Sequence, residues 1–334
     1  MNKKLKTSLN TILFLVIGVA LFIWATSNVG LDQLIQDIKE ADAKWIALSM
    51  FCGILSHLFR ALRWKLLIEP MNFKATSAGA FHSTIVGYMV NMAVPRLGEV
   101  TRPAMLSKLE DIPFNKLVGT VLLERIVDLI ITLLIAVAIV FMQFQLIADF
   151  LNELVASGGD NLVKYGIGIG LFFILFALGI RYRKWIYKLP IISKFKGFFE
   201  GVVDGLKTIT QLKKKGMFIA YSLLIWFMYF LMPYFVLFAL EGTSHLGAAA
   251  GLTVLLFGTF AMIIPVPGGL GTFEVLVPAA LALYGVVGAI GESYAIITHA
   301  VQVILILAVG LISVGYFVIK SQKKKKNGVV TDHS

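Results

Sequence analysis

Charged residues are scarce in this chain of 334 residues, since Asp, Glu, Lys and Arg together make up only 15% of it. A soluble domain averages about 25% charged residues, so this chain lacks the polar groups that would cover a globule in water. Hydrophobic residues make up 58%, and the mean hydropathy is +0.85. The composition excludes a soluble enzyme, a disordered chain and a fibrous protein, and it indicates an all-α polytopic membrane protein.

Cysteine is almost absent, with Cys52 as the single thiol. A disulfide framework and a cysteine-rich metal site are therefore excluded. The His, Asp and Glu residues show no spacing typical of a metal site, and the sequence contains neither a Walker loop nor a Gly-x-Ser-x-Gly motif. We therefore expect no metal, no cofactor and no ATP-driven step.

Long apolar runs are what the sequence has instead. A spanning helix needs about 20 mostly apolar residues, and about six full spans are expected, over residues 11–25, 45–68, 117–142, 163–180, 217–240 and 294–319. Two further apolar stretches, 77–94 and 246–287, are followed or interrupted by Pro and Gly, which break helices. Segments 31–45 and 185–215 are amphipathic and suit the headgroup layer.

Basic and acidic residues are distributed unevenly along the chain. It carries 30 basic residues and 19 acidic residues, which gives a net charge of +11. Of the 30 basic residues, 26 lie in five segments, 1–10, 60–74, 96–116, 181–215 and 320–334. The positive-inside rule places these segments and both termini in the cytoplasm, which predicts a multi-pass protein of the cell inner membrane. The excess thus indicates orientation, and no nucleic-acid partner is expected.

With that orientation, stretch 77–94 begins and ends in the cytoplasm, whereas 246–287 begins and ends outside. Both are therefore predicted to be broken, re-entrant helical hairpins. Residues 94–100 read Val-Pro-Arg-Leu-Gly-Glu-Val, and residues 266–275 repeat Val-Pro, Leu-Gly and Glu-Val with insertions. We expect two inverted-topology halves, about 8–144 and 160–319, as in transporters that bind substrate at broken helices near the bilayer midplane. The alternative is a chance recurrence of Pro-Gly breaks.

The chain is expected to form one integral membrane domain over 1–334, with a basic cytoplasmic tail at 320–334. Within it, the return arm 99–109 of the first hairpin is too polar to face lipid. It must be buried in protein or line a wet cavity.

Charged residues inside a bilayer are costly and usually mark a path or a site. Glu124, Arg125 and Asp128 lie within the span 117–142. Glu124 and Asp128 are four residues apart and share a helix face, while Arg125 and Asp128 are three apart and can pair. A structural ion cluster that holds this helix to the first hairpin is the alternative to a binding site.

Polar residues also surround the first break, namely Asn91, Arg96, Glu99 and Arg102. Two arginines can hold a phosphate through bidentate hydrogen bonds. The helix that begins near Gly98 would point its free N–H groups at the same place.

The second break offers a similar arrangement. Gly268, Gly269 and Gly271 allow a ligand close to the backbone, and a half-helix begins there. Two opposed helix N-termini predict an anion site. Glu99 and Glu274 lie in the first turns of these helices, where they could cap N–H groups, pair with arginine or carry protons; capping is the simpler interpretation.

Arg60 and Arg63, next to Trp64, end the second span. The favoured interpretation is that their side chains extend to the cytoplasmic headgroups. The functional alternative is that they attract an anionic headgroup toward the site. His82 and His299 lie in apolar helices, where a hydrogen-bonded packing role is more common than a proton relay.

Four motifs stand in order along about residues 11–319: Arg60-Ala-Leu-Arg63-Trp64, Asn91-x-x-x-Pro95-Arg96-x-Gly98-Glu99-x-x-Arg102, Glu124-Arg125-x-x-Asp128 and Pro265-x-Pro267-Gly268-Gly269-x-Gly271-x-x-Glu274. Together they resemble the lysylphosphatidylglycerol synthase transmembrane-region family, the flippase-like domain proteins. The resemblance implies movement of an aminoacylated phospholipid between leaflets, while a separate cytoplasmic domain makes that lipid. Other relatives accompany polyprenyl-phosphate sugar and cell-envelope pathways. This sequence ends in a lysine run and a short polar tail, so synthase activity is not implied.

The leading hypothesis is a non-enzymatic lipid transporter. Its substrate would be an anionic or zwitterionic phospholipid or a polyprenyl phosphate, driven by a gradient or moving downhill. The alternative is a membrane enzyme or accessory factor that acts on lipid-linked phosphate or sugar. As an enzyme it would use Glu99, Glu124 or Asp128 as acid or base, and as an accessory factor it would work beside a separate lipid-modifying enzyme. A third is a scaffold whose buried charges serve folding alone. The oligomeric state stays open.

Overall fold

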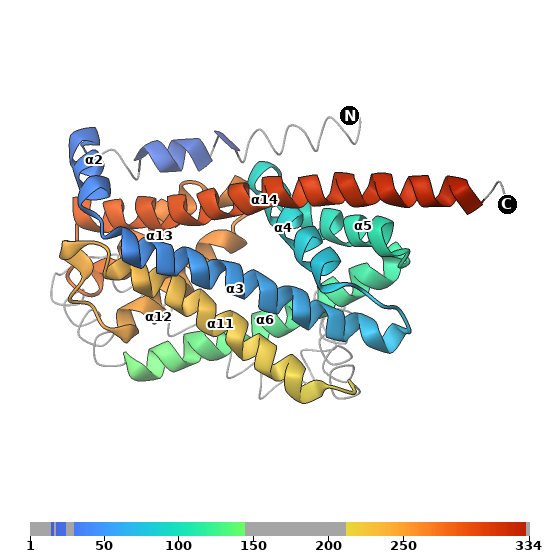
Figure 1. Cartoon of the computed structure of the whole chain (residues 1–334). Helices are drawn as coiled ribbons and strands as arrows, with labels where there is room; N and C mark the ends of the chain where they lie inside the picture. Colours follow the sequence, from blue (N-terminus) through green and yellow to red (C-terminus); the bar gives the residue numbers. More distant parts are fainter. Residues whose placement is uncertain (1–14, 17, 25–29, 144–211, 332–334) are drawn as a thin grey trace, which may run out of the picture. The chain divides into compact units, whose positions relative to one another are not determined.

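The computed structural model describes residues 15–16, 18–24, 30–143 and 212–331, and Figure 1 shows their arrangement. These residues form α-helices and short 3-10 helices and contain no strand, which confirms the all-α fold. Apart from the last residues of α6, the described helices belong to a compact unit made of Met1–Ala136 and Leu212–Ser334. The predicted span 163–180, most of the amphipathic segment 185–215 and the start of the second predicted half lie outside the described residues.

Four described helices are long and apolar enough to cross a membrane. They are α3 (Ala43–Ile68), α6 (Phe114–Met142), α11 (Lys215–Leu237) and α14 (Ala289–Thr331). The predicted spans 45–68, 117–142 and 217–240 agree with the first three to within a few residues, because an uninterrupted apolar run of this length is a strong helical signal. The amphipathic segment that precedes α3 forms the separate helix α2 (Leu31–Glu40), and the Asp42 carboxylate accepts a hydrogen bond from the Lys44 N–H at the start of α3.

Both predicted breaks are present. The first separates α4 (Ser77–Ala93) from α5 (Gly98–Glu110), and the second separates α12 (Ala248–Ile263) from α13 (Thr272–Ala282), with the short η3 (Pro267–Gly269) between them. The same order of elements thus occurs twice, once in α3–α6 and once in α11–α14: a long helix, a short helix, a break, a short helix and a long helix. The inverted topology and the re-entrant path of each hairpin through a bilayer stay predictions.

The two broken hairpins meet at their breaks. η3 contacts α4, and a methyl group placed on Gly268 would lie 3.7 Å from the Cα of Met92, near the end of α4. Gly268 adopts a φ of 61°, a conformation that glycine reaches without steric cost. Two motifs that are distant in the sequence therefore lie together at this contact.

The long helices α3 and α11 run side by side, as Figure 1 shows, and α14 packs against α4 and α13. Small residues allow close approach of helices inside a membrane. Gly53 of α3 faces the side chains of Met232 and Leu305, and the Ser49 hydroxyl donates to the Met232 carbonyl at 2.9 Å. Of these helices, α3 and α14 both contact α4 of the first hairpin.

The polar return arm packs against protein, as expected. α5 lies against α4, and its residues Gly98, Arg102, Pro103, Leu106 and Leu109 are buried. Their spacing of three or four residues puts them on one face of the helix. The polar side chains of the arm thus do not all face lipid.

The last helix extends beyond both ends of the predicted span 294–319. α14 continues as a helix to Thr331, because lysine is a good helix former and the helix end finds ionic partners. Lys320 lies 3.3 Å from the Glu110 carboxylate and Lys324 lies 2.5 Å from that of Asp111. The first part of the predicted tail therefore packs against the end of α5.

The tightest helix contact provides a stability test. A methyl group on Gly98 would overlap the carbonyl oxygen of Gly87 in α4, so Gly98→Ala should destabilise the protein by about 1–3 kcal/mol. Gly119→Ala is the matched control, since nothing lies within 4 Å of the added methyl. In thermal unfolding of the purified protein, we expect a lower midpoint for Gly98→Ala and an unchanged or higher one for Gly119→Ala. Equal midpoints would contradict the close contact.

Candidate functional site

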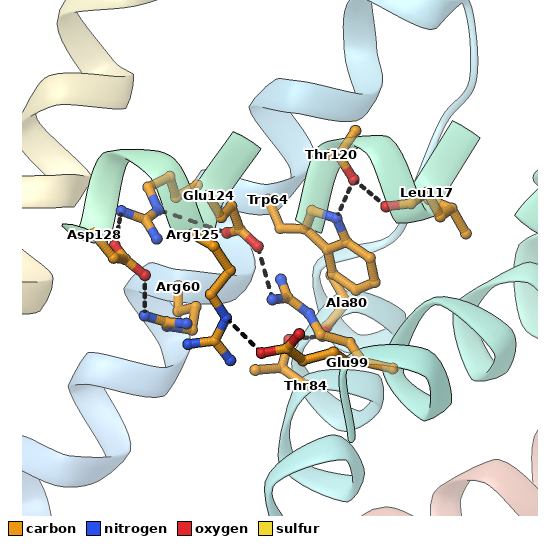
Figure 2. A network of polar contacts seen from close by, with 12 residues as sticks. Arg60, Trp64, Ala80, Thr84, Glu99, Leu117, Thr120, Glu124, Arg125 and Asp128 are labelled. Carbon is orange, nitrogen blue, oxygen red and sulfur yellow. Dashed lines mark hydrogen bonds and ion pairs between the residues drawn. The ribbon is translucent and has the colours of Figure 1, made fainter. Parts of the chain in front are cut away.

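A buried network of ion pairs joins α3, α5 and α6, as Figure 2 shows. Asp128 of α6 lies 2.6 Å from the Arg60 guanidinium and 2.8 Å from that of Arg63. Glu124, one turn earlier on α6, lies 2.7 Å from the Arg102 guanidinium and 3.5 Å from the Arg63 Nε. Each of these five residues is at most 8% exposed, so the network is shielded from water.

Helix spacing explains how the network forms. Glu124 and Asp128 share one face of α6, as predicted, and Arg60 and Arg63 are three residues apart on α3. The expected extension of Arg60 and Arg63 to the headgroups is wrong, because both are buried against carboxylates. The interpretation as an ion cluster that holds α6 to the first hairpin is confirmed through Arg102 of α5.

Aromatic and hydroxyl groups complete the network. The Arg102 guanidinium lies 3.8 Å from the centre of the Trp64 ring, and the Trp64 indole N–H donates to the Thr120 hydroxyl at 2.7 Å. The Arg63 guanidinium also donates to the Ser222 hydroxyl of α11 at 3.2 Å. Sequence reasoning missed Thr120 and Ser222, since single hydroxyls in apolar helices carry no pattern that singles them out.

The buried network carries an excess positive charge. Three guanidinium groups face two carboxylates, so one positive charge is not matched within the network. Among the described residues, each of the three arginines has buried N–H groups without a hydrogen-bond partner, namely the Nε of Arg60 and the Nε and Nη2 of both Arg63 and Arg102; Glu124 and Asp128 each have one carboxylate oxygen that accepts no hydrogen bond. Buried charge and unsatisfied donors are both costly, and an additional anion would relieve both costs.

Arg125 and Glu99 form a separate, half-exposed pair. Their side chains lie 3.1 Å apart and are 43% and 40% exposed. Arg125 and Asp128, whose spacing allows a pair, bind different partners, because Asp128 is turned toward α3 and Arg125 toward α5.

A recess lies between the buried network and the pair Arg125–Glu99. Its cavity volume is about 20 Å³, and it is lined by residues of α3, α4, α5 and α6, among them Arg60, Tyr88, Asn91, Glu99, Arg102 and Arg125. A cavity of this size holds about one water molecule. The recess brings together five of the predicted site residues, Arg60, Asn91, Glu99, Arg102 and Arg125.

Other predicted residues of the first break have different positions. The Asn91 side chain accepts a hydrogen bond from the Gly98 N–H at 2.6 Å, so it caps the start of α5. Arg96 is exposed, has a φ of 64° and does not line the recess. The first turn of α5 is thus not an empty anion site, since one of its N–H groups is already bound.

The second break is closed by its own side chains. Glu274 accepts the Gly271 N–H at 2.7 Å, so the capping interpretation of Glu274 is confirmed. Gly268, Gly269 and Gly271 all have positive φ, and none of them lines the recess. The sequence did not reveal that His299, 25 residues further on, lies 2.5 Å from the Glu274 carboxylate.

Comparisons with known proteins identify a family of membrane proteins. Residues 11–310 match the family model described as lysylphosphatidylglycerol synthase TM region, and the chain belongs to this family. It is similar to a UPF0104 membrane protein of Methanocaldococcus jannaschii, with 22% identity over 97% of this chain and 99% of the relative. A UPF0104 membrane protein of Pyrococcus horikoshii is 23% identical over 93% of this chain and 97% of the relative. No solved structure matches.

The buried network predicts a large difference between two carboxamide substitutions. Asp128→Asn leaves Arg60 and Arg63 without a shared carboxylate and should cost about 3–5 kcal/mol, as for other broken buried ion pairs. Glu99→Gln removes a half-exposed partner and should cost about 1 kcal/mol or less. Thermal unfolding in detergent measures both, and similar midpoints for the two variants would show that the network is not shielded from water.

Proposed function

We propose that this protein moves an amphiphile with an anionic headgroup, a phospholipid or a polyprenyl phosphate, from one membrane leaflet to the other. The observation that carries the proposal is the unmatched positive charge of the buried network beside the recess. Membership of the lysylphosphatidylglycerol synthase transmembrane-region family supports a role with membrane lipids.

The chemistry of the recess favours a phosphate-type headgroup. Arginine binds phosphate oxygens through bidentate, charge-assisted hydrogen bonds. Arg60 and Arg102 both line the recess, and each has at least one buried N–H group without a hydrogen-bond partner among the residues that the structure describes. The acyl or prenyl tails stay in the bilayer, so only the polar headgroup enters the protein. A headgroup near the broken helices avoids the cost of crossing hydrocarbon.

The size of the recess implies a closed state. A volume of about 20 Å³ has no room for a phosphate, so the recess must widen before a headgroup enters. The half-exposed pair Arg125–Glu99 borders the recess and is the contact that costs least to separate. Once separated, Arg125 is free to bind the incoming headgroup.

Acid–base catalysis by the same carboxylates is less well supported. Glu124 and Asp128 are each bound by arginine, and Glu99 pairs with Arg125. A carboxylate held in this way is a weak general base, because its charge is already stabilised. Transport is therefore the function we propose, with both termini in the cytoplasm and the cell inner membrane as the location.

Reconstitution into liposomes tests the proposal with two matched arginine variants. The rate at which a fluorescent anionic phospholipid, a zwitterionic one or a polyprenyl phosphate changes leaflet is measured by quenching of the outer leaflet. Arg125→Gln should slow the anionic lipids about tenfold or more, the effect of one lost charged hydrogen bond of about 1.5–3 kcal/mol. Arg96→Gln changes an exposed arginine outside the recess and should leave the rate unchanged.

Protein-free liposomes and the stability of both variants are the controls. If wild type moves none of the three lipid classes faster than empty liposomes, the protein is not a transporter for them. If Arg96→Gln and Arg125→Gln slow transport equally, the recess is not the headgroup site.

A further inference from the structure

A second buried ionisable pair lies outside the recess. Glu274 of α13 and His299 of α14 are 3% and 5% exposed, and the Glu274 Oε1 lies 2.5 Å from the His299 Nδ1. On the other side of the ring, the His299 Nε2 lies 2.9 Å from the carbonyl oxygen of Gly268. The pair therefore joins α13, α14 and the second break.

Hydrogen-bond chemistry fixes the proton count of this pair. A carbonyl oxygen can only accept, so the His299 Nε2 must carry a proton and donate to Gly268. The contact between Nδ1 and Oε1 then requires a second proton, either on the histidine or on the carboxyl group. The Glu274 Oε2 already accepts the Gly271 N–H, so all three contacts form together only when the pair holds one proton more than neutral histidine and ionised glutamate.

This pair differs chemically from the buried network of α3, α5 and α6. The carboxylates of that network face arginines, which keep their protons at every relevant pH. Glu274 faces a histidine, the side chain that gains and loses a proton near neutral pH. Among the described residues, the ion pair with His299 is the only one that Glu274 makes.

Titratable groups on the neighbouring helices have partners elsewhere. His82 of α4 contacts the Ser313 hydroxyl at 2.9 Å, and the Tyr294 hydroxyl of α14 donates to the Pro233 carbonyl of α11 at 2.6 Å. His57 of α3 lies against Tyr88 of α4. In the described part of the chain, no charged residue of α3, α4, α5 or α11 is ion-paired with Glu274 or His299, and α12 has no titratable side chain.

We infer that Glu274 and His299 form an exchangeable proton site, and that its proton is the coupling ion for lipid movement; the coupling rests on the proposed function. When the proton leaves, one of two contacts is lost. Either Nδ1 faces an anionic carboxylate without a proton between them, or Nε2 faces the Gly268 carbonyl without one. Both are repulsive, so proton release loosens the second break.

The contact between the two breaks links this site to the recess. Gly268, whose carbonyl binds His299, lies against Met92. Met92 is adjacent in sequence to Asn91, which lines the recess and caps Gly98. A change in the Gly268 segment is therefore transmitted to the wall of the recess through one residue.

Glu274→Gln is the central variant, because glutamine can accept from the Gly271 N–H and donate to the His299 Nδ1 without an exchangeable proton. It imitates the proton-loaded pair and should fold. Glu241→Gln, at an exposed carboxylate, is the matched control. In proteoliposomes, a gradient of about one pH unit should shift the leaflet ratio of a fluorescent anionic phospholipid by up to about tenfold, for one proton per lipid. We expect this shift in wild type and Glu241→Gln, and its loss in Glu274→Gln.

A second measurement reports the proton site without lipid movement. Met92→Cys is made in a Cys52→Ser background, and its rate of reaction with a soluble thiol reagent is followed with pH. Dividing this rate by that of the same chain with Glu274→Gln removes the pH dependence of the thiol itself. The ratio should change through a single-proton transition, whereas the corresponding ratio for Glu241→Gln should stay constant.

The outcomes separate this inference from the proposed function. A ratio that is constant with pH, or a Glu274→Gln protein that follows the pH gradient as wild type does, overturns the proton site or its coupling. Lipid movement that is lost in Arg125→Gln but insensitive to pH in wild type overturns the coupling and leaves the transport proposal standing. A pH-dependent ratio with no lipid movement in any variant supports the proton site and overturns transport.

Discussion

An arginine side chain keeps its positive charge at every relevant pH. This constraint determines how the helices α3, α5 and α6 are held together. Three guanidinium groups lie inside an apolar helix bundle, where a lost proton is not an available way to reduce the cost. Carboxylates must therefore come to them, and α6 supplies two on one face. The pairing fixes α6 against α3 and, through Arg102, holds the polar helix α5 inside the protein. The break after α4 lets the chain turn back, so that α5 packs against α4 and Arg102 reaches Glu124.

The sequence predicted the elements better than their contacts. Apolar run length located α3, α6 and α11, and Pro95 and the glycines after Pro267 located the breaks, because these signals are local. The partner of each charge was not predictable, since Arg125 could face Asp128 along its own helix or Glu99 across the bundle. In the structure, helix packing brings Arg125 next to Glu99, and these two side chains form the ion pair. His299 was likewise seen as an isolated histidine, because its partner Glu274 lies on another helix.

The buried acids Glu124 of α6 and Glu274 of the second break have chemically different partners. Glu124 is held by Arg102 and Arg63. Because guanidinium groups keep their protons, the charge of this network is constant. Glu274 is held by His299, and an imidazole ring, unlike a guanidinium group, exists in neutral and protonated forms. A protein that binds an anion and then releases it needs both properties: a constant attraction and a contact that changes.

Helix α14 connects regions that are distant from each other in the chain. His299 holds the second break near one part of it, and Lys320 and Lys324 hold the end of α5 near another. The 25 residues from His299 to Lys324 correspond to a stiff rod of about 38 Å. A tilt of about 5° around His299 would move the far end by about 3 Å at this rise per residue. A rotation of α14 about His299 would therefore move the end of α5, the helix whose first turns line the recess.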